Sequence, residues 1–86
     1  MKINQRVIAM QCTEGNKAYI YGRGVYVGDH VPESGIFHEV GMTNPKIELD
    51  NGGVVYGYQC WWADEKRVDE EFKGMEIIEV PVEVPE

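Results

Sequence analysis

The fold is decided by the stretch Asn44-Pro45-Lys46-Ile47-Glu48-Leu49-Asp50-Asn51-Gly52-Gly53-Val54-Val55-Tyr56-Gly57-Tyr58-Gln59-Cys60-Trp61-Trp62. It predicts a short strand over residues 46–49, a tight turn over 50–53 and a long aromatic strand that returns over 54–62. Asn-Gly between two strand-like runs is a strong hairpin signal, because both residues tolerate the positive φ that a tight turn needs. Side chains alternate along a strand, so the return strand should present one row on a single face: Val54, Tyr56, Tyr58, Cys60 and Trp62. The stretch therefore predicts a β-hairpin, and it indicates no particular reaction.

More strands are expected on both sides of this hairpin, over residues 6–12, 18–27 and 75–84. The first of these is mostly apolar and should be covered on both faces for part of its length. Gly22 and Gly24 weaken the second strand and predict a bulge or a sharp bend within it. Pro81 cannot donate a ladder hydrogen bond, so the last strand should lie at an edge or leave the sheet near that residue.

A short helix should follow Trp62, because Asp64 is a good N-cap and Gly74 can end the helix in a left-handed conformation. The predicted fold is mainly β (α+β): a small SH3-like bent β-barrel of about five strands with this one helix. A chain of 86 residues has room for a single core, so residues 1–86 should form one domain.

The segment over residues 28–43 is expected to be irregular, and a loop of about 16 residues is long for a compact domain. Long loops often carry function. This one contains four large apolar residues, so part of it should pack on its own domain or on a partner: Ile36, Phe37, Val40 and Met42.

Charge and cysteine content narrow the class of function. A net charge of -7 opposes binding to long nucleic acids, while a small anionic ligand could still be held by a few local cations. The N-terminal residues lack the apolar core of a signal peptide, and no run approaches the roughly 20 apolar residues that span a membrane. Cys12 and Cys60 are therefore expected to be free, buried thiols in a cytoplasmic protein without membrane partners.

No motif indicates catalysis or a metal site. The glycine-rich segment 22–28 lacks the helix and the Lys-Ser/Thr pair of a phosphate-binding loop. His30 and His38 have no partner at the spacing of metal ligands. Asp29 lies beside His30, but nothing pairs them with a nucleophile. We expect no enzyme activity, no cofactor and no bound metal.

Aromatic and basic side chains carry the binding hypothesis. Trp61 and Trp62 are neighbours on a predicted strand, so they point to opposite faces and at most one lies in the core. Arg23 lies between two glycines and should be exposed to whatever approaches that backbone, with Arg6 and Lys46 as further candidates for contacting phosphate. The candidate ligand-binding residues are Tyr21, Arg23, Tyr26, Asn44, Lys46, Tyr58, Trp61 and Trp62.

Three runs of the sequence resemble a poorly characterised group of small β-barrel proteins from phages and bacteria: Gly24-Val25-Tyr26-Val27-Gly28-Asp29-His30-Val31-Pro32, Asn44-Pro45-Lys46-Ile47-Glu48-Leu49-Asp50 and Gly53-Val54-Val55-Tyr56-Gly57-Tyr58-Gln59-Cys60-Trp61-Trp62. The resemblance covers about half the chain, and it transfers no functional residue. Some small phage proteins of this size are counter-defence sponges, which bind a cyclic-nucleotide immune signal without degrading it. The resemblance implies a phage inhibitor that acts in the cytosol of the host cell.

Two functions follow as hypotheses, both non-catalytic. In the first, the protein sequesters a small anionic, nucleotide-type ligand between protomers, with aromatic faces for the base and cations for the phosphate. In the second, it is an acidic protein-interaction module that binds and blocks a host protein through its acidic helix and long loop. A small domain with surplus aromatic residues is expected in either case to form a homo-oligomer.

Overall fold

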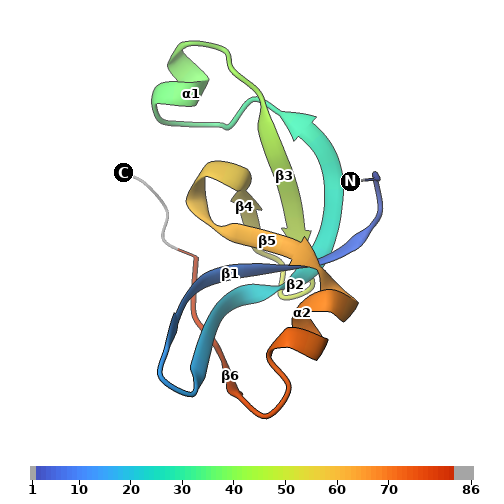
Figure 1. Ribbon diagram of the computed structural model, residues 1–86. Helices are drawn as coiled ribbons and strands as arrows, with labels where there is room; N and C mark the ends of the chain where they lie inside the picture. Colours follow the sequence, from blue (N-terminus) through green and yellow to red (C-terminus); the bar gives the residue numbers. More distant parts are fainter. Residues whose placement is uncertain (1, 83–86) are drawn as a thin grey trace.

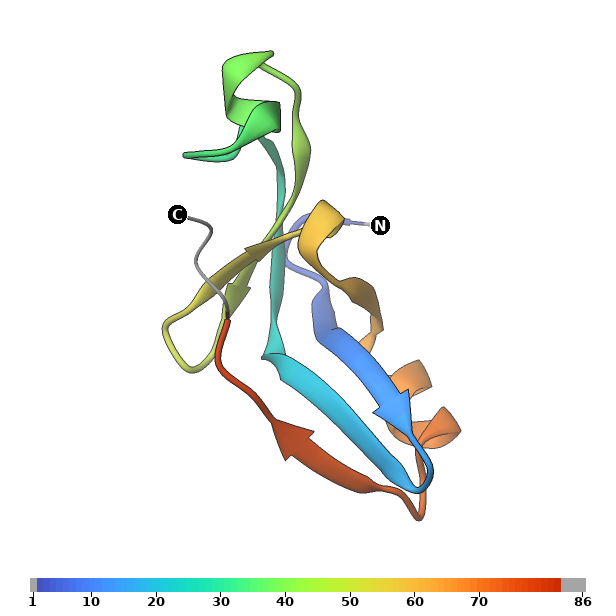
Figure 2. The ribbon, with the colours of Figure 1, turned by 90° about the vertical axis from the view of Figure 1, so that its left-hand side faces the viewer.

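The computed structural model describes residues 2–82, which form a bent sheet of six strands with one short α-helix at an end of the molecule and a second against a face of the sheet (Figure 1). The strands are β1 (Arg6–Glu14), β2 (Lys17–His30), β3 (Asn44–Leu49), β4 (Val54–Tyr56), β5 (Trp61–Asp64) and β6 (Glu76–Glu79). The helices are α1 (Ile36–Glu39), α2 (Glu65–Glu71) and the 3-10 helix η1 (Gly57–Gln59). The molecule is elongated, 41 × 28 × 19 Å, with α1 at one end and the β1–β2 hairpin at the other (Figure 2).

The sheet is organised around β2. Its strand order is β4-β3-β2-β1-β5, with β6 pairing β2 off this path. One edge of β2 takes two partners in succession: β6 pairs with residues 17–20 in parallel, and β3 pairs with residues 24–30 antiparallel. Within residues 2–82 no ladder joins β4 to β5, so the sheet is unclosed. The mainly β class is confirmed, and the predicted SH3-like barrel is not confirmed.

The bend in β2 has the cause predicted from its glycines. The pairing of β1 with β2 slips between Ala9 and Met10, beside Gly22, whose φ is 149°. At Gly24 the strands β2 and β3 approach so closely that a Cβ atom would lie 2.8 Å from the Cα atom of Leu49. Glycine is the one residue that fits both positions without strain.

The core lies on both faces of the sheet, because β1 is buried on both faces as its apolar sequence predicted. One cluster consists of Val7, Ala9, Tyr21, Ile47, Leu49 and Val55. The other lies under α2 and consists of Ile8, Ile20 and Val68. Ile8 thus belongs to a different cluster from its neighbours Val7 and Ala9, as strand alternation requires.

The central hairpin is confirmed, with two corrections. Gly52 has a positive φ of 92°, but Asn51 does not, so only one residue of the Asn-Gly pair supplies the unusual backbone. The return strand ends at Tyr56 and gives way to η1, which makes the prediction of one continuous aromatic strand wrong. The Gln59 side chain accepts a hydrogen bond of 2.9 Å from the Tyr56 backbone N–H, and this local bond turns the chain out of the sheet.

Outside the hairpin, some segments have the structure predicted from the sequence and others differ from it. The helix after Trp62 is α2, and its N-cap Asp64 accepts a hydrogen bond of 3.3 Å from the Arg67 backbone N–H. The strand β6 ends at Glu79, before Pro81, while residues 83–84 of the predicted strand lie outside the described range. The irregular segment predicted over residues 28–43 is shorter than expected, since β2 continues to His30 and α1 forms one helical turn. No helix within residues 2–82 has both the length and the apolar character to cross a membrane.

Candidate binding surface

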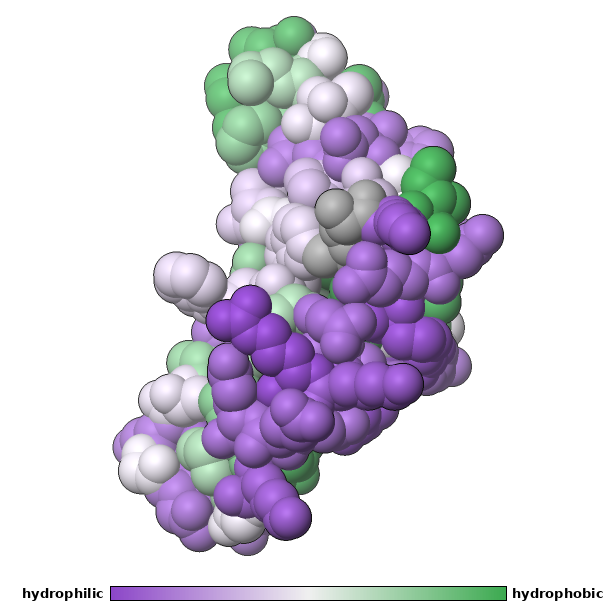
Figure 3. Space-filling view, turned by 45° about the vertical axis from the view of Figure 1, so that its right-hand side comes forward, coloured by the Kyte–Doolittle hydropathy of each residue, from purple (hydrophilic) through white to green (hydrophobic). Residues whose placement is uncertain are grey.

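The end of the molecule that carries α1 exposes a group of large apolar side chains. We name residues 31–42 the α1 knob. Its exposed fractions are 62% for Ile36, 57% for Val40, 55% for Met42 and 40% for Val31. In Figure 3 this end, at the top, is coloured as hydrophobic. Contiguous exposed apolar surface on a small protein marks an interaction site, because folding gains nothing from it.

The α1 knob is held in a defined shape. The ring of Phe37 packs on the ring of Tyr58 in η1, with centroids 4.8 Å apart. His38 lies with Nδ1 2.9 Å from the carbonyl oxygen of the buried Pro32, which accepts a hydrogen bond from it. Gly35 and Gly41 have φ values of 86° and 70° and turn the chain at the two ends of α1. A preformed shape lowers the entropy cost of binding.

An aromatic row continues from the α1 knob onto the sheet. Tyr58 stacks on Tyr56, with centroids 6.3 Å apart and an interplanar angle of 17°. Lys46 lies directly opposite Tyr56 across the β3–β4 ladder, so the two side chains share a face. Within residues 2–82 every ion pair uses an arginine, and Lys46 takes part in none. Asn44, two residues before Lys46 on β3, shares that face as well.

Among the large hydrophobic side chains of residues 2–82, Trp61 is the most exposed, at 76%. It lines an open hollow of about 480 Å³ together with Tyr58, and the other lining residues are Gln11, Gly57, Gln59 and Cys60. Trp62 points the other way and stacks in parallel with Tyr26, with centroids 6.2 Å apart. The prediction that the two tryptophans face opposite sides is confirmed.

Both arginines proposed as phosphate ligands are occupied by carboxylates of the chain itself. Arg23 binds Asp69 through two hydrogen bonds of 2.9 and 2.7 Å, and it contacts Glu65 at 3.2 Å. Arg6 binds Asp50 in the same bidentate manner and shares the same Glu65 oxygen at 3.3 Å. The hydrogen bonds from the arginines lower the pKa values of Asp69 and Asp50. The arginines therefore fasten α2 and the central turn to the sheet.

Two tyrosines in the predicted ligand set lie in structural positions instead. Tyr21 is a member of the main core and is only 7% exposed. Tyr26 stacks on Trp62, and its hydroxyl donates a hydrogen bond of 2.7 Å to Asp29, which raises the pKa of Tyr26. The eight predicted residues are thus not one site. Asn44, Lys46 and Tyr58 share the aromatic row, and Trp61 adjoins it, while Tyr21, Arg23, Tyr26 and Trp62 hold the fold together.

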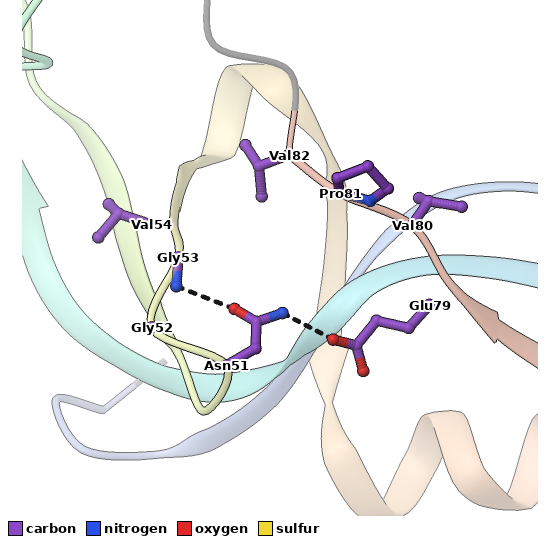
Figure 4. A pocket seen from close by; sticks show the side chains of 8 residues that line it. All are labelled: Asn51, Gly52, Gly53, Val54, Glu79, Val80, Pro81 and Val82. Carbon is purple, nitrogen blue, oxygen red and sulfur yellow. Dashed lines mark hydrogen bonds between the residues drawn. The ribbon is translucent and has the colours of Figure 1, made fainter.

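A second hollow, of about 670 Å³, lies between the central turn and the segment that follows β6 (Figure 4). Asn51 and Glu79 face each other at its edge and form a hydrogen bond of 2.7 Å. Its other lining side chains in the described part of the chain are apolar: Val54, Val80, Pro81 and Val82. Among residues 2–82 no lysine or arginine lines this hollow to hold an anion.

The two thiols are free, as predicted, but they differ in environment. Cys12 is exposed, so the prediction that both are buried is wrong, because the β1–β2 hairpin extends beyond the core. Burial raises the pKa of Cys60 to about 12, so this thiol stays protonated. Within residues 2–82 no group of three histidine, cysteine or acidic side chains could hold a metal ion.

The residues that sequence reasoning left out of the site are the apolar side chains of the α1 knob. The sequence carried a signal for them, because this loop gathers several large apolar residues and was expected to pack on its own domain or on a partner. Comparison of the chain with protein-family models, curated proteins and solved structures gives no match. The functional argument therefore rests on the residues of the surface itself.

Proposed function

We propose that this chain is a non-catalytic binding protein that docks onto another protein through the α1 knob. The observation that carries the proposal is the exposure of Ile36, Val40 and Met42 on a segment held in place by Phe37. Each such side chain contributes about 1.5–3 kcal/mol when it passes from full exposure to full burial. A partner that covers the α1 knob gains much of that energy.

The charge around the α1 knob specifies the chemistry of the partner. Three exposed carboxylates lie within the α1 knob or close before it in the sequence: Asp29, Glu33 and Glu39. The whole chain, with these three carboxylates included, carries a net charge of -7. A complementary partner has an apolar groove with lysine or arginine at its rim, since opposite charges speed association and discriminate between partners.

This proposal keeps the blocking of a host protein by a phage-encoded inhibitor, and it keeps the long loop over residues 28–43 as the contact without the acidic helix. The acidic helix α2 is a poorer candidate for the contact, because Glu65 and Asp69 already bind Arg6 and Arg23. The α1 knob, by contrast, has apolar surface without a partner inside the described residues.

The test begins with capture of proteins from a bacterial lysate on immobilised wild-type protein, followed by calorimetry with the purified partner. The double variant Ile36→Ser, Val40→Ser should weaken binding by about 30-fold or more, as expected for apolar anchors. Glu33→Lys, Glu39→Lys should slow association and reduce its dependence on salt.

A matched control reverses two charges on α2, Glu70→Lys and Glu71→Lys, which are exposed and distant in sequence from the α1 knob. We expect this control to bind like the wild type. If the α2 variant loses binding and the α1 knob variants keep it, the contact is the acidic helix and the proposal for the α1 knob fails.

A second candidate function is sequestration of a nucleotide-type ligand on the aromatic row. The observation that favours it is the position of Lys46 opposite Tyr56, next to the stacked ring of Tyr58. A base could stack on the tyrosine faces while Lys46 contacts a phosphate.

A panel of mono-, di- and cyclic nucleotides, added to wild type and to Lys46→Ala, tests this candidate by thermal shift. A ligand at about 100 times its Kd adds roughly 2.7 kcal/mol of stability. A shift that disappears in Lys46→Ala supports sequestration. Arg23→Ala should not remove it, because Arg23 is bound to Asp69. The absence of any shift in the wild type leaves protein binding as the function.

A further inference from the structure

The hollow beside Trp61 adjoins the α1 knob, because its lining residue Tyr58 packs on Phe37, but no residue of the knob lines it. Two aromatic side chains line it, Trp61 at 76% exposure and Tyr58 at 40%. Two glutamines line it as well, Gln11 and Gln59, and the side-chain oxygen of Gln59 accepts the hydrogen bond from the Tyr56 N–H. The remaining lining comes from Gly57 and Cys60, so within residues 2–82 no charged side chain lines the space.

Trp61 is not required at this place by the fold. Its neighbour Trp62 supplies the aromatic packing on the core face, against Tyr26. A tryptophan this exposed gains little from folding, and tryptophan and tyrosine are the residues that concentrate binding energy at interfaces.

We propose that this hollow binds a proline-rich segment of a partner protein in the polyproline II conformation. Proline rings are compact and apolar, and they pack well on aromatic faces such as those of Trp61 and Tyr58. A polyproline II segment has no internal hydrogen bonds, so its carbonyl groups remain available to donors. The exposed Gln11 carboxamide at the edge of the hollow can supply such a donor.

Two other ligand classes fit the hollow less well. A nucleotide needs a cation for its phosphate, and among the residues that the structure describes no lysine or arginine lines this space. A long aliphatic chain needs an enclosed apolar cavity, whereas this hollow is open and its two carboxamides are polar.

The net charge of the whole chain favours basic residues at the two ends of the proline-rich segment. With a net charge of -7, the protein attracts a proline-rich segment that is flanked by arginine or lysine. The occupant of the hollow is thus a basic-flanked, proline-rich peptide, and its binding should weaken as salt is added.

The test uses calorimetry with a synthetic proline-repeat peptide that carries an arginine at each end. The control peptide has the same length and the same arginines, with glycine and serine in place of proline. We expect saturable binding of the proline peptide only. Trp61→Ala should weaken binding about tenfold or more, as for an aromatic anchor. Tyr58→Phe keeps the ring and removes only the hydroxyl, so it should change binding little.

A fluorescence experiment reports on the site itself. The chain has two tryptophans, so Trp62→Phe leaves Trp61 as the sole indole, and the proline peptide should shift its emission to shorter wavelength. If Trp62→Phe does not fold, judged by circular dichroism, the wild-type emission serves with Trp61→Phe as its blank.

Equal binding of both peptides, or binding that survives Trp61→Ala, would overturn the proposal. So would the absence of both heat and emission change when the proline peptide is added. An emission change that depends on protein concentration and not on added peptide would overturn it as well. The α1 knob variant Ile36→Ser, Val40→Ser should bind the proline peptide like the wild type. Its behaviour distinguishes failure of this site from failure of the α1 knob.

Discussion

The side-chain amide of Asn51 donates a hydrogen bond of 3.2 Å to the backbone carbonyl of Tyr21, at the point where the edge of β2 passes from β6 to β3. The same amide nitrogen donates to Glu79 at 2.7 Å, and the side-chain oxygen accepts from the Gly53 N–H at 2.9 Å. One side chain therefore fills the gap between two ladders and ties the central turn to the end of β6.

Asn51→Ala should lower the free energy of unfolding by about 1–3 kcal/mol, because it leaves the Tyr21 carbonyl without its donor. Asn51→Asp should be worse, since it places a carboxylate against the Tyr21 carbonyl and against Glu79. Urea denaturation measures both, with the exposed turn variant Asn16→Ala as the control. Equal stability of Asn51→Ala and wild type would show that water replaces the amide without loss.

A side chain should reduce the stability of the fold by different amounts at Gly52 and at Gly24. A Cβ at Gly52 meets no atom within 4 Å, so Gly52→Val acts through the positive φ alone and should cost more than about 1 kcal/mol. A Cβ at Gly24 would press on the carbonyl oxygen of Glu48 and separate β2 from β3. Thermal melts should therefore rank Gly24→Ala as the less stable variant. The opposite order would mean that the β2–β3 contact is looser than the structure shows.

Acid should weaken the attachment of α2. The hydrogen bond from Arg23 lowers the pKa of Asp69 in the folded state below its unfolded value. The ionised form is thus favoured by folding, and its contribution is present above the unfolded pKa and is lost as pH falls through the folded pKa. Asp69→Asn should be less stable than wild type at neutral pH, and the difference should shrink below about pH 4. A difference that is independent of pH would exclude the ion pair as its origin.

The two tryptophans should respond in opposite ways to truncation. Trp61→Ala should change stability by no more than about 0.5 kcal/mol, because the side chain is mostly exposed. Trp62→Ala removes the partner of Tyr26 and opens a space beside the main core, so it should cost about 3 kcal/mol or more. Paired denaturation curves test this contrast. Similar losses for both variants would mean that Trp61 is covered in solution.

Self-association is expected from the apolar α1 knob and from Trp61. The net charge of -7 on each copy opposes it, so association should strengthen as salt screens the repulsion. Light scattering at micromolar concentration, in low and high salt, measures the mass. A constant mass of 9.8 kDa in both conditions would show that the chain is a monomer.

Local signals in the sequence were sufficient for part of this fold. The cap at Asp64, the positive φ of Gly52 and the opposite faces of Trp61 and Trp62 each follow from one or two neighbouring residues. The bend beside Gly22 could also be predicted from a single residue, because glycine allows backbone angles that other residues rarely adopt.

The remaining features depend on residues that are far apart in the chain. Arg23 and Asp69 are 46 positions apart in the sequence, and no local spacing pattern predicts that they form an ion pair. The parallel pairing of Lys17 with Glu76 is likewise a property of the assembled sheet. Because both contacts are long-range, the sequence predicted that Arg23 is available to a ligand, and it did not predict the pairing of β6 with β2.

The division of the core between the two faces of β1 has a consequence for amide hydrogen exchange. The cluster under α2 holds three buried residues, Ile8, Ile20 and Val68, while the cluster on the other face holds six. Lifting α2 off the sheet breaks the smaller cluster and leaves the larger one intact. Amides of α2 should therefore exchange through a local opening, and those of Val7 and Ile47 should exchange only when the whole domain unfolds.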